Sequence, residues 1–344
     1  MNTYIPFLMS SIESKLIRIV KNFKGKKIKV VGDIILDEYI FGDVERISPE
    51  APVPIVVVKE KKYNLGGAAN VAWNIKALGG EPELYGVIGD DHSSEILLNL
   101  LDKKEIKTNG IIKAPSRPTT RKTRVIGQHQ QIVRIDEETT EPIKFSQRKI
   151  ILEKFLENED FTAVIFEDYE KGTISKELVS EIVKRNKKKI ITCDPKKHNF
   201  SFYKKISMLK PNRKELEFVA RRELKSEADM VKEIEKLSRR LDIPLILLTL
   251  GDKGMILKDN ESVYRIPSLE VEVYDVTGAG DTVIASFTLS MVSDSNPLEA
   301  ALISTIAAGI EVTKLGASAV FPDELIEMIN KRSSEIYRGI RKIK

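Results

Sequence analysis

The stretch "DVTGAGDTVIASFTLSM" (275–291) carries two glycines and an alanine immediately ahead of an apolar helical pattern. Glycine beside a helix is costly, because it loses more conformational freedom on folding than any other residue. The first N–H groups of a helix have no intrahelical acceptor, and the helix dipole adds positive potential there. Small residues at Gly278, Ala279 and Gly280 therefore predict a backbone nest that an anion such as phosphate can approach closely.

Asp281 falls in the first turn of this predicted helix, directly beside the nest. A carboxylate in that position can accept the proton of a substrate hydroxyl while the nest stabilises charge on a transferring phosphoryl group. A simple helix cap after a glycine turn is the alternative, and the motif alone leaves both interpretations open. The stretch lacks the third glycine of a dinucleotide-binding fingerprint, and the chain has no Walker A sequence.

On either side of this stretch, apolar strand patterns and amphipathic helix patterns alternate along the chain. The predicted buried strands are 27–33, 161–168, 189–194, 207–212 and 244–251. The predicted helices lie within the first 25 residues and at 66–80, 280–292, 297–313 and 322–336. Near-continuous hydrophobic strands separated by helices indicate an α/β fold with a mostly parallel central sheet and helices on both faces.

Two segments break this rhythm. Residues 38–62 and 117–137 alternate polar and apolar side chains with a period of two, which is typical of hairpin-like strands outside the main sheet. A further hairpin is predicted within 253–268. Because the chain shows no internal repeat, low-complexity tract or linker, residues 1–344 are interpreted as a single domain with a small β appendage.

The composition excludes several classes of protein. Fifty-six basic and fifty-one acidic residues leave a net charge of +5, without the concentrated basic face that nucleic acid requires. The single cysteine, Cys193, rules out an internal disulfide, and His92, His129 and His198 lack zinc-ligand spacing. No apolar run approaches the roughly 18 residues of a membrane span, and no signal peptide is apparent. These features predict a cytoplasmic protein without nucleic-acid or membrane partners.

Polar residues also follow two of the early strands. In "GGAAN" (66–70), Gly66 and Gly67 occupy a strand-to-helix turn and Asn70 lies one turn into the helix, an arrangement suited to sugar hydroxyls. Tight helix packing by small residues is the alternative. Asp33 ends the first strand, where open α/β sheets bind ligands, although such aspartates also serve as turn caps.

Two later motifs offer a nucleotide site. In "KPNRKE" (210–215), Asn212 and Glu215 share one face of a helix that begins there and could hold hydrated magnesium, or could simply form a capping pair. "TLGDKG" (249–254) places a glycine turn after a strand, near a nucleotide or in an ordinary hairpin. Each motif alone leaves both interpretations open.

Taken together and in this order, these motifs resemble the ribokinase (PfkB-type) carbohydrate kinases, over essentially residues 26–322. Within that family, four further stretches resemble D-glycero-β-D-manno-heptose-7-phosphate kinases. They are "GDIILDEYIFGDVERISPEAPVPI" (32–55), "HQQIVRIDEE" (129–138), "DYEKG" (168–172) and "CDPKK" (193–197). The resemblance implies a ribokinase-like fold in which 38–62 and 117–137 form a lid, and ATP-dependent phosphorylation of the heptose phosphate at its anomeric hydroxyl.

The resemblance also implies roles for individual residues. Asp281 would be the catalytic base and the nest at 278–280 the anion hole. The sugar would be held by Asp33, Gly66, Gly67 and Asn70. ATP and Mg²⁺ would lie along Asn212, Arg213, Lys214 and Glu215, with Thr249, Gly251 and Gly254 near the nucleotide. Asp275 and Thr277, with the loop 313–318, would hold a monovalent cation such as K⁺.

The phosphate that the sugar already carries requires cations, and arginine suits it through paired hydrogen bonds. Arg134 and Lys171 are the two selected from a wider set of basic residues, which consists of Arg46, Arg121, Lys122, Arg124, Arg134, Lys171 and Lys196. His129 and Lys197 depart from the heptose kinase pattern, so a kinase for another sugar, such as fructose 1-phosphate, a ketohexose or ribose, is the alternative. A sugar-phosphate sensor without turnover is more remote.

The resemblance finally implies partners. Family members often dimerise through the lid, so a homodimer is expected. The chain has no HxGH nucleotidyltransferase motif. It is therefore expected to act as a kinase alone, with no C-terminal nucleotidyltransferase domain, and to leave adenylyl transfer to a separate protein.

Overall fold

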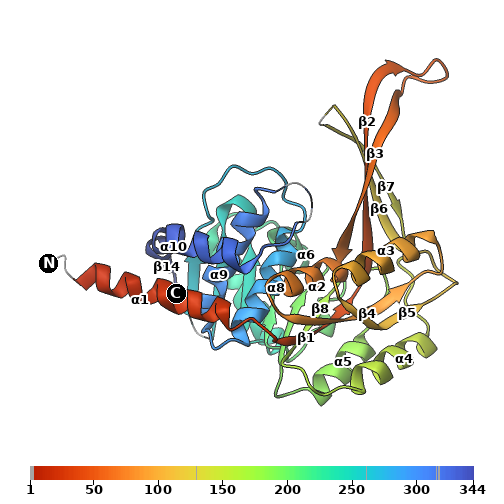
Figure 1. The fold of residues 1–344 in the computed structure, drawn as a ribbon. Helices are drawn as coiled ribbons and strands as arrows, with labels where there is room; N and C mark the ends of the chain where they lie inside the picture. Colours follow the sequence, from red (N-terminus) through yellow and green to blue (C-terminus); the bar gives the residue numbers. More distant parts are fainter. Residues whose placement is uncertain (1–3, 129, 261, 315, 317) are drawn as a thin grey trace.

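The computed structural model describes the backbone of residues 4–128, 130–260, 262–314, 316 and 318–344, with side chains from residue 12 onward. In this part of the chain a ten-stranded sheet is flanked by helices, and a four-stranded sheet projects from one end of the body (Figure 1). The α/β prediction, with a small additional sheet, is confirmed.

The large sheet is mostly parallel, as the sequence predicts. From one edge to the other its strands are β14 (Arg341–Lys342), β13 (Ser262–Ile266), β12 (Met255–Asp259), β11 (Leu245–Thr249), β10 (Met208–Leu209), β9 (Ile190–Asp194), β8 (Ala163–Glu167), β1 (Lys27–Gly32), β4 (Glu81–Ile88) and β5 (Lys107–Lys113). The strands from β11 to β5 run parallel to their neighbours, whereas β12 and β13 form the predicted antiparallel hairpin at one side.

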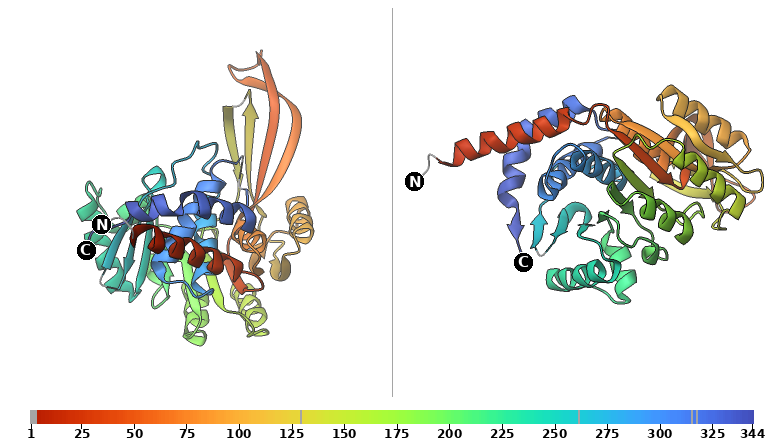
Figure 2. Two further views of the ribbon diagram at one scale, coloured as in Figure 1. Left: turned by 60° about the vertical axis from the view of Figure 1, so that its left-hand side comes forward. Right: turned by 90° about the horizontal axis from the view of Figure 1, so that it is seen from below.

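Two apolar layers cover opposite faces of this sheet, because successive strand residues point to opposite sides. Val30 of β1 belongs to one buried cluster and Val31 to the other. The first face carries α1 (Tyr4–Lys21), α2 (Ala68–Ala77), α3 (His92–Lys103), α8 (Ala279–Met291), α9 (Pro297–Glu311) and α10 (Pro322–Gly339). The second carries α4 (Phe145–Leu156), α5 (Lys176–Arg185), α6 (Arg213–Ala220), α7 (Glu227–Leu241) and the short helix η1 (Phe200–Phe202). Figure 2 shows these helices on both sides.

The second sheet contains the two segments predicted to lie outside the main sheet. Its strands, in spatial order, are β3 (Pro54–Gly67), β2 (Ile34–Ile47), β6 (Thr120–Gly127) and β7 (Gln130–Glu137). β2–β3 and β6–β7 are antiparallel hairpins, and a parallel pairing between β2 and β6 joins them. The hairpins stand away from the body (Figure 2), and their outer ends are largely exposed.

The chemically interesting residues follow the carboxyl ends of the parallel strands. Asp33 follows β1, Asp168 follows β8, Asp194 ends β9 and Lys210 follows β10. Because parallel strands all end at one edge, these side chains gather there, and this edge is where ligands bind in open α/β sheets. Among the described residues, no helix combines the length and apolar character needed to cross a membrane.

Candidate active site

The loop before α8 has the geometry expected of an anion nest. Gly278 precedes the helix with φ of 98°, a left-handed conformation that favours glycine. A side chain at Gly280 would meet the Lys210 ammonium, because an added Cβ would lie 3.3 Å from its Nζ. The first turn of α8 therefore offers both free backbone N–H groups and a nearby ammonium to an anion.

Asp281 lies at the centre of the site and contacts two distant segments. Its Oδ2 accepts a 2.7 Å hydrogen bond from Asn70 Nδ2 of α2, and its Oδ1 accepts one of 3.2 Å from the Tyr169 hydroxyl. Burial raises the pKa of Asp281 to about 6, while the Asn70 hydrogen bond opposes this rise. The carboxyl group is thus held in place and is more basic than an ordinary aspartate, which suits a proton acceptor.

A buried ion pair lies beside the nest. Lys210 Nζ is 2.7 Å from Asp194 Oδ2, and the two side chains are 4% and 7% exposed. Burial works against the charged ammonium, but Asp194 and Glu167 outweigh it and raise the pKa of Lys210. Lys210 therefore remains charged and can stabilise negative charge on a group bound at the nest.

Glu167 adds a third carboxylate to this region. Oxygens of Glu167, Asp194 and Asp281 all lie within 4.8 Å of one another, a grouping that could hold a metal ion. Glu167 is fully buried, and neither of its carboxylate oxygens has a hydrogen-bond partner among the described residues. Burial, together with the charges of Asp194 and Asp281, raises its pKa well above the ordinary value. Glu167 thus binds either a proton or a cation.

The motif at 210–215 forms the capping pair that was one of its two interpretations. Asn212 Oδ1 accepts a 3.0 Å bond from Glu215 N, and Glu215 Oε2 accepts a 2.8 Å bond from Asn212 N. The other Glu215 oxygen lies 3.2 Å from Lys196 Nζ, and this ammonium also lies 4.5 Å from the centre of the Tyr169 ring. Capping does not exclude water-mediated magnesium binding, which stays a prediction.

One cleft of about 870 Å³ joins most of the predicted nucleotide residues to the base. Its size is typical of small-molecule sites. The predicted residues that line it are Asn212, Arg213, Lys214, Thr249, Gly251, Gly254, Gly278, Ala279, Gly280 and Asp281. Apolar side chains, including Leu250, Val276 and Val312, form much of the rest. Gly251 begins the short helix η2 (Gly251–Lys253), and an added Cβ at Gly254 would collide with the Ile266 carbonyl oxygen at 2.3 Å.

The predicted sugar residues do not line this cleft, although one of them, Asn70, contacts Asp281. Gly66 and Gly67 end β3, and Gly67 has φ of 55°. A Cβ at Gly67 would lie 2.5 Å from the Asp33 carbonyl oxygen, and one at Gly66 would lie 2.5 Å from Asp37 Oδ2. Both glycines are therefore required by tight packing, and any contact with sugar stays a prediction.

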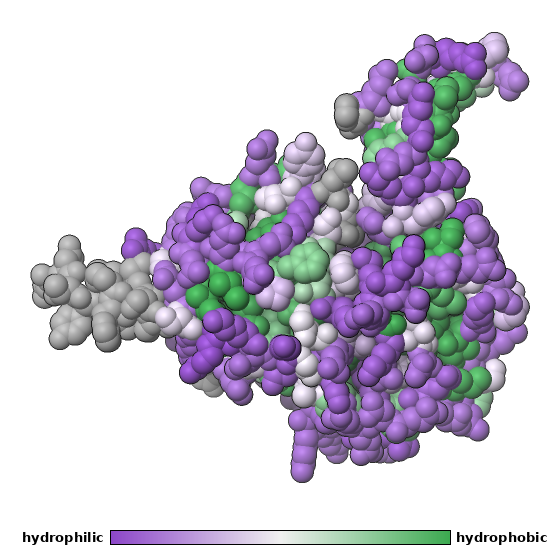
Figure 3. Space-filling model, in the orientation of Figure 1, coloured by the Kyte–Doolittle hydropathy of each residue, from purple (hydrophilic) through white to green (hydrophobic). Residues whose placement is uncertain are grey.

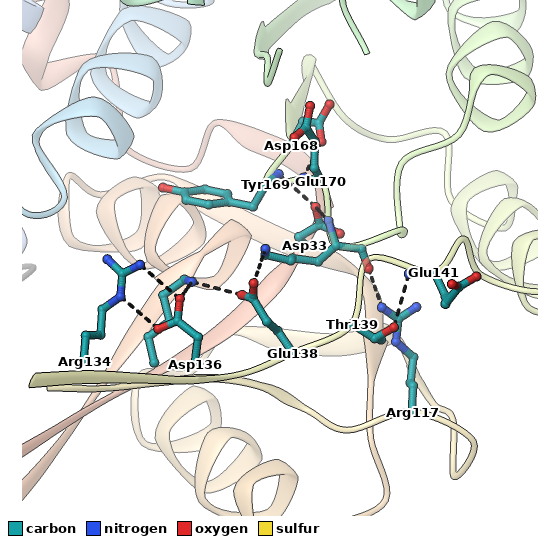
Figure 4. Close-up of polar contacts among 12 residues, drawn as sticks. Asp33, Arg117, Arg134, Asp136, Glu138, Thr139, Glu141, Asp168, Tyr169 and Glu170 are labelled. Atoms are coloured by element: carbon teal, nitrogen blue, oxygen red, sulfur yellow. Dashed lines mark hydrogen bonds and ion pairs between the residues drawn. The ribbon is translucent and has the colours of Figure 1, made fainter. Parts of the chain in front are cut away.

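Asp33 is a loop organiser in this structure. Its carboxylate accepts a backbone hydrogen bond from Tyr169 at 2.8 Å (Figure 4). It accepts two more, from the N–H groups of Lys171 at 2.9 Å and Thr173 at 3.0 Å. Because Tyr169 in turn contacts Asp281, Asp33 fixes the segment that positions the base. Its direct contact with sugar is not seen and stays a prediction.

The predicted phosphate cations are engaged with acidic partners. Lys171 Nζ lies 2.6 Å from Glu138 Oε1. Arg134 is half-exposed on β7 and forms two bonds with Asp136, at 2.9 and 3.0 Å (Figure 4). The other basic candidates on the second sheet are likewise paired, Arg121 with Glu137 and Arg124 with Asp37, except the exposed Arg46. Lys122 contacts both Asp136 and Glu138 at 3.0 Å, so Arg134 and Lys171 belong to one network of ion pairs, and their binding of a sugar phosphate stays a prediction.

The predicted monovalent-cation loops do come together. Asp275 Oδ1 accepts a 2.9 Å bond from Thr277 N, and Asp275 Oδ2 accepts one of 3.1 Å from Gly316 N. Asp275 thus ties the loop before α8 to the loop after α9. Residues 315 and 317 of the predicted 313–318 loop, and the predicted specificity position His129, lie outside the described residues.

Four residues of the site had no role assigned from sequence: Tyr169, Glu167, Asp194 and Lys210. Each lies at or within two residues of the carboxyl end of an observed strand, and three of them lie in stretches that carry the resemblance to sugar kinases. The usable signal was a polar residue at the carboxyl end of a buried strand. Which of these residues meet depends on strand order, which the local pattern does not contain.

The fold and site define the class: an ATP-dependent sugar kinase, built on a mostly parallel sheet with a small second sheet. The chain belongs to the pfkB family of carbohydrate kinases, whose family model matches residues 26–324. It is 40% identical over 314 residues to the bifunctional protein HldE of Helicobacter pylori strain HPAG1, covering 90% of this chain and 68% of that protein. It is 38% identical over 312 residues to the HldE protein of Geobacter metallireducens, covering 89% of this chain and 63% of that protein.

Solved structures share the fold. Phosphofructokinase-2 from Escherichia coli superposes with a TM-score of 0.74 at 19% identity, covering 90% of this chain and 99% of that one. Ribokinase from Thermotoga maritima superposes with a TM-score of 0.69 at 25% identity, covering 89% of this chain and 99% of that one. These likenesses confirm the ribokinase-like fold.

Proposed function

We propose that this kinase phosphorylates D-glycero-β-D-manno-heptose 7-phosphate at its C1 hydroxyl, giving the 1,7-bisphosphate for ADP-heptose and lipopolysaccharide core synthesis. The observation that carries the chemistry is the position of Asp281, which lines the cleft together with the predicted nucleotide residues and accepts hydrogen bonds from Asn70 of α2 and from Tyr169. The choice of heptose rests on the similarity to HldE proteins and on the stretches that resemble heptose kinases.

The chain's own residues account for the phosphoryl transfer. Asp281 accepts the proton of the C1 hydroxyl as its oxygen forms a bond to the γ-phosphorus of ATP. The bond from that phosphorus to the bridging oxygen breaks, and ADP leaves. The nest at 278–280 and the Lys210 ammonium stabilise the charge on the phosphoryl group during transfer. Asn70 and Tyr169 orient the Asp281 carboxylate.

The residues fit the cations that such a reaction needs. Glu215 and Asn212 would hold Mg²⁺ through water, because this ion prefers oxygen ligands and keeps several of its waters, and it would neutralise phosphate charge. Asp275, Thr277 and the loop 313–318 would hold K⁺, because Asp275 already joins the two loops. E. coli phosphofructokinase-2 has been crystallised in complex with potassium.

The proposal predicts ADP release from ATP and Mg²⁺ that depends on heptose 7-phosphate and is much weaker with fructose 1-phosphate, fructose 6-phosphate or ribose. A coupled assay over these sugars, run in potassium and in sodium buffers, measures it. Preferred turnover of another sugar would replace the heptose substrate while keeping the kinase mechanism. Equal rates in both buffers would remove K⁺ from the proposal.

We also propose a cytoplasmic homodimer joined through the second sheet, with an adenylyltransferase acting downstream of the kinase reaction. Figure 3 shows apolar side chains along the projecting sheet, and Val57, Val133 and Ile135 are about half exposed there. Exposed apolar surface of this kind often marks an interface.

The dimer is expected to dissociate in the double variant Val133→Lys/Ile135→Lys, because two desolvated charges would face the partner. Sedimentation velocity measures the change. The matched control is Phe145→Lys, which removes an apolar side chain that is 71% exposed on α4, away from the second sheet. A monomeric wild type, or a double variant that sediments like the wild type, would contradict this assembly.

A further inference from the structure

The carboxylate of Glu138 joins two ammonium groups from different parts of the molecule. Its Oε1 lies 2.6 Å from Lys171 Nζ, and its Oε2 lies 3.0 Å from Lys122 Nζ. The three side chains are 23%, 14% and 15% exposed, so the bridge is largely screened from water. Burial acts to raise the pKa of Glu138, but the hydrogen bonds from Lys171 and Lys122 outweigh it and lower the pKa. Glu138 is therefore an anion held by two cations.

This bridge lies where the second sheet meets the segment that positions the base. Lys122 belongs to β6 and Glu138 follows β7, whereas Lys171 belongs to the 169–173 segment. The backbone N–H of Lys171 donates to Asp33, and the hydroxyl of Tyr169, two residues earlier, donates to Asp281. Figure 4 shows Glu138 facing the group formed by Asp33 and Tyr169. An anion in place of the Glu138 carboxylate would thus contact both the second sheet and the active-site segment.

A third cation lies next to the bridge. Arg117 donates to the carbonyl oxygen of Lys171, and its side chain is only partly exposed. Burial lowers the pKa of Arg117, with the charge of Asp33 acting in the opposite direction. Within the described residues no carboxylate lies at ion-pair distance from its guanidinium. Lys122 also pairs with Asp136 Oδ2 at 3.0 Å and would keep that partner without Glu138. Lys171 would lose its paired carboxylate, and with Arg117 beside it would offer the positive charge that a phosphate dianion requires.

We propose that Glu138 occupies, in the substrate-free enzyme, the subsite for the phosphate already present on the sugar, and that Lys122 and Lys171 bind this phosphate once it displaces Glu138. The inference rests on the proposed function for its substrate class, a phosphorylated sugar. A dianion bridging both ammonium groups holds the second sheet over the active site more strongly than the single charge of Glu138 does. Glu138 thereby raises the preference for phosphorylated over unphosphorylated sugars.

Two variants and one matched control test this assignment. Calorimetry measures the binding of heptose 7-phosphate and of unphosphorylated heptose, and steady-state kinetics give KM and kcat. Lys171→Met is expected to weaken the binding of heptose 7-phosphate by roughly 10- to 100-fold, since one charged hydrogen bond is lost. The binding of unphosphorylated heptose should change little. Glu138→Gln is expected to tighten the binding of heptose 7-phosphate by roughly 3- to 10-fold, because it removes the ion pairs that compete with the phosphate for the two lysines. kcat is expected to change less than KM in both variants.

The matched control is Glu137→Gln, the same change one residue earlier, where the carboxylate pairs with Arg121 and contacts neither lysine. If Glu138→Gln weakens the binding of heptose 7-phosphate and of heptose to the same extent, Glu138 only supports the second sheet and the proposal is wrong. Equal losses for both sugars in Lys171→Met would also overturn it. If another sugar phosphate is the true substrate, the proposed heptose function fails, and the same comparison with that sugar phosphate and its unphosphorylated form decides the subsite separately.

Discussion

Asp281→Asn is expected to lower kcat by about 10²- to 10⁴-fold, the usual contribution of a general base. The substitution keeps the shape of the side chain, and an amide oxygen can still accept from Asn70 or Tyr169, so the fold should persist. ADP release under saturating ATP and sugar phosphate measures the loss, and circular dichroism with thermal unfolding checks the fold. Turnover within about threefold of the wild type would remove Asp281 from the role of base.

The same assignment predicts a pH dependence. Because the pKa of Asp281 is about 6 and the base must be ionised, kcat/KM is expected to fall as the pH drops below about 6. A sugar phosphate also titrates near this pH, so a residue-specific control is needed. Asn70→Ala removes a hydrogen bond that lowers the pKa of Asp281, and the acid limb should move to higher pH. If the acid limb of the pH profile does not move in Asn70→Ala, the titration belongs to the substrate.

Lys210→Met is expected to destabilise the protein by about 3–5 kcal/mol, because it removes one partner of a buried ion pair and leaves Asp194 uncompensated beside Glu167. Urea denaturation at pH 8 measures the change in the free energy of unfolding. Activity should fall as well, since the same ammonium lies at the nest.

The control for Lys210→Met is the double variant Lys210→Met/Glu167→Gln. It removes the ionisable group of Glu167, whose pKa is raised on folding, without changing side-chain size, so it should recover part of the lost stability at pH 8. The recovery should be smaller at pH 5, because a carboxyl group whose pKa is raised on folding destabilises the folded state less as the pH falls toward its ordinary pKa. A double variant no more stable than Lys210→Met would show that Glu167 carries no unfavourable charge.

Much of the fold could be predicted from local patterns. Period-two alternation marked β2, β3, β6 and β7 as strands apart from the main sheet, and continuous apolar runs marked β1, β8, β9 and β11 as buried. Turn chemistry was equally informative: the glycine pattern predicted a turn ahead of the helix, and Gly278 lies there with φ of 98°. These features depend on residues a few positions apart, and the periods of strands and helices record them directly.

The candidate site was only partly predictable. The motifs supplied Asp281 and Asn70 separately, but their hydrogen bond joins residues 211 positions apart. Asp33 was assigned to the sugar, yet its carboxylate is bound to backbone N–H groups 136 to 140 positions later. Lys171 and Arg134 pair with different carboxylates, Glu138 and Asp136, and Lys122 joins these two carboxylates across neighbouring strands. Long-range contacts of this kind follow from strand order and register, which local periodicity does not specify.

Local sequence was thus sufficient for the α/β class, the second sheet and the glycine turn ahead of α8, because each depends on periodicity or on the conformational demands of a short turn. Tertiary structure alone placed Lys210, Asp194 and Glu167 beside Asp281, and Glu138 between Lys122 and Lys171. The physical reason is that charges interact according to distance and burial in space, and parallel strands bring the ends of distant segments to one edge.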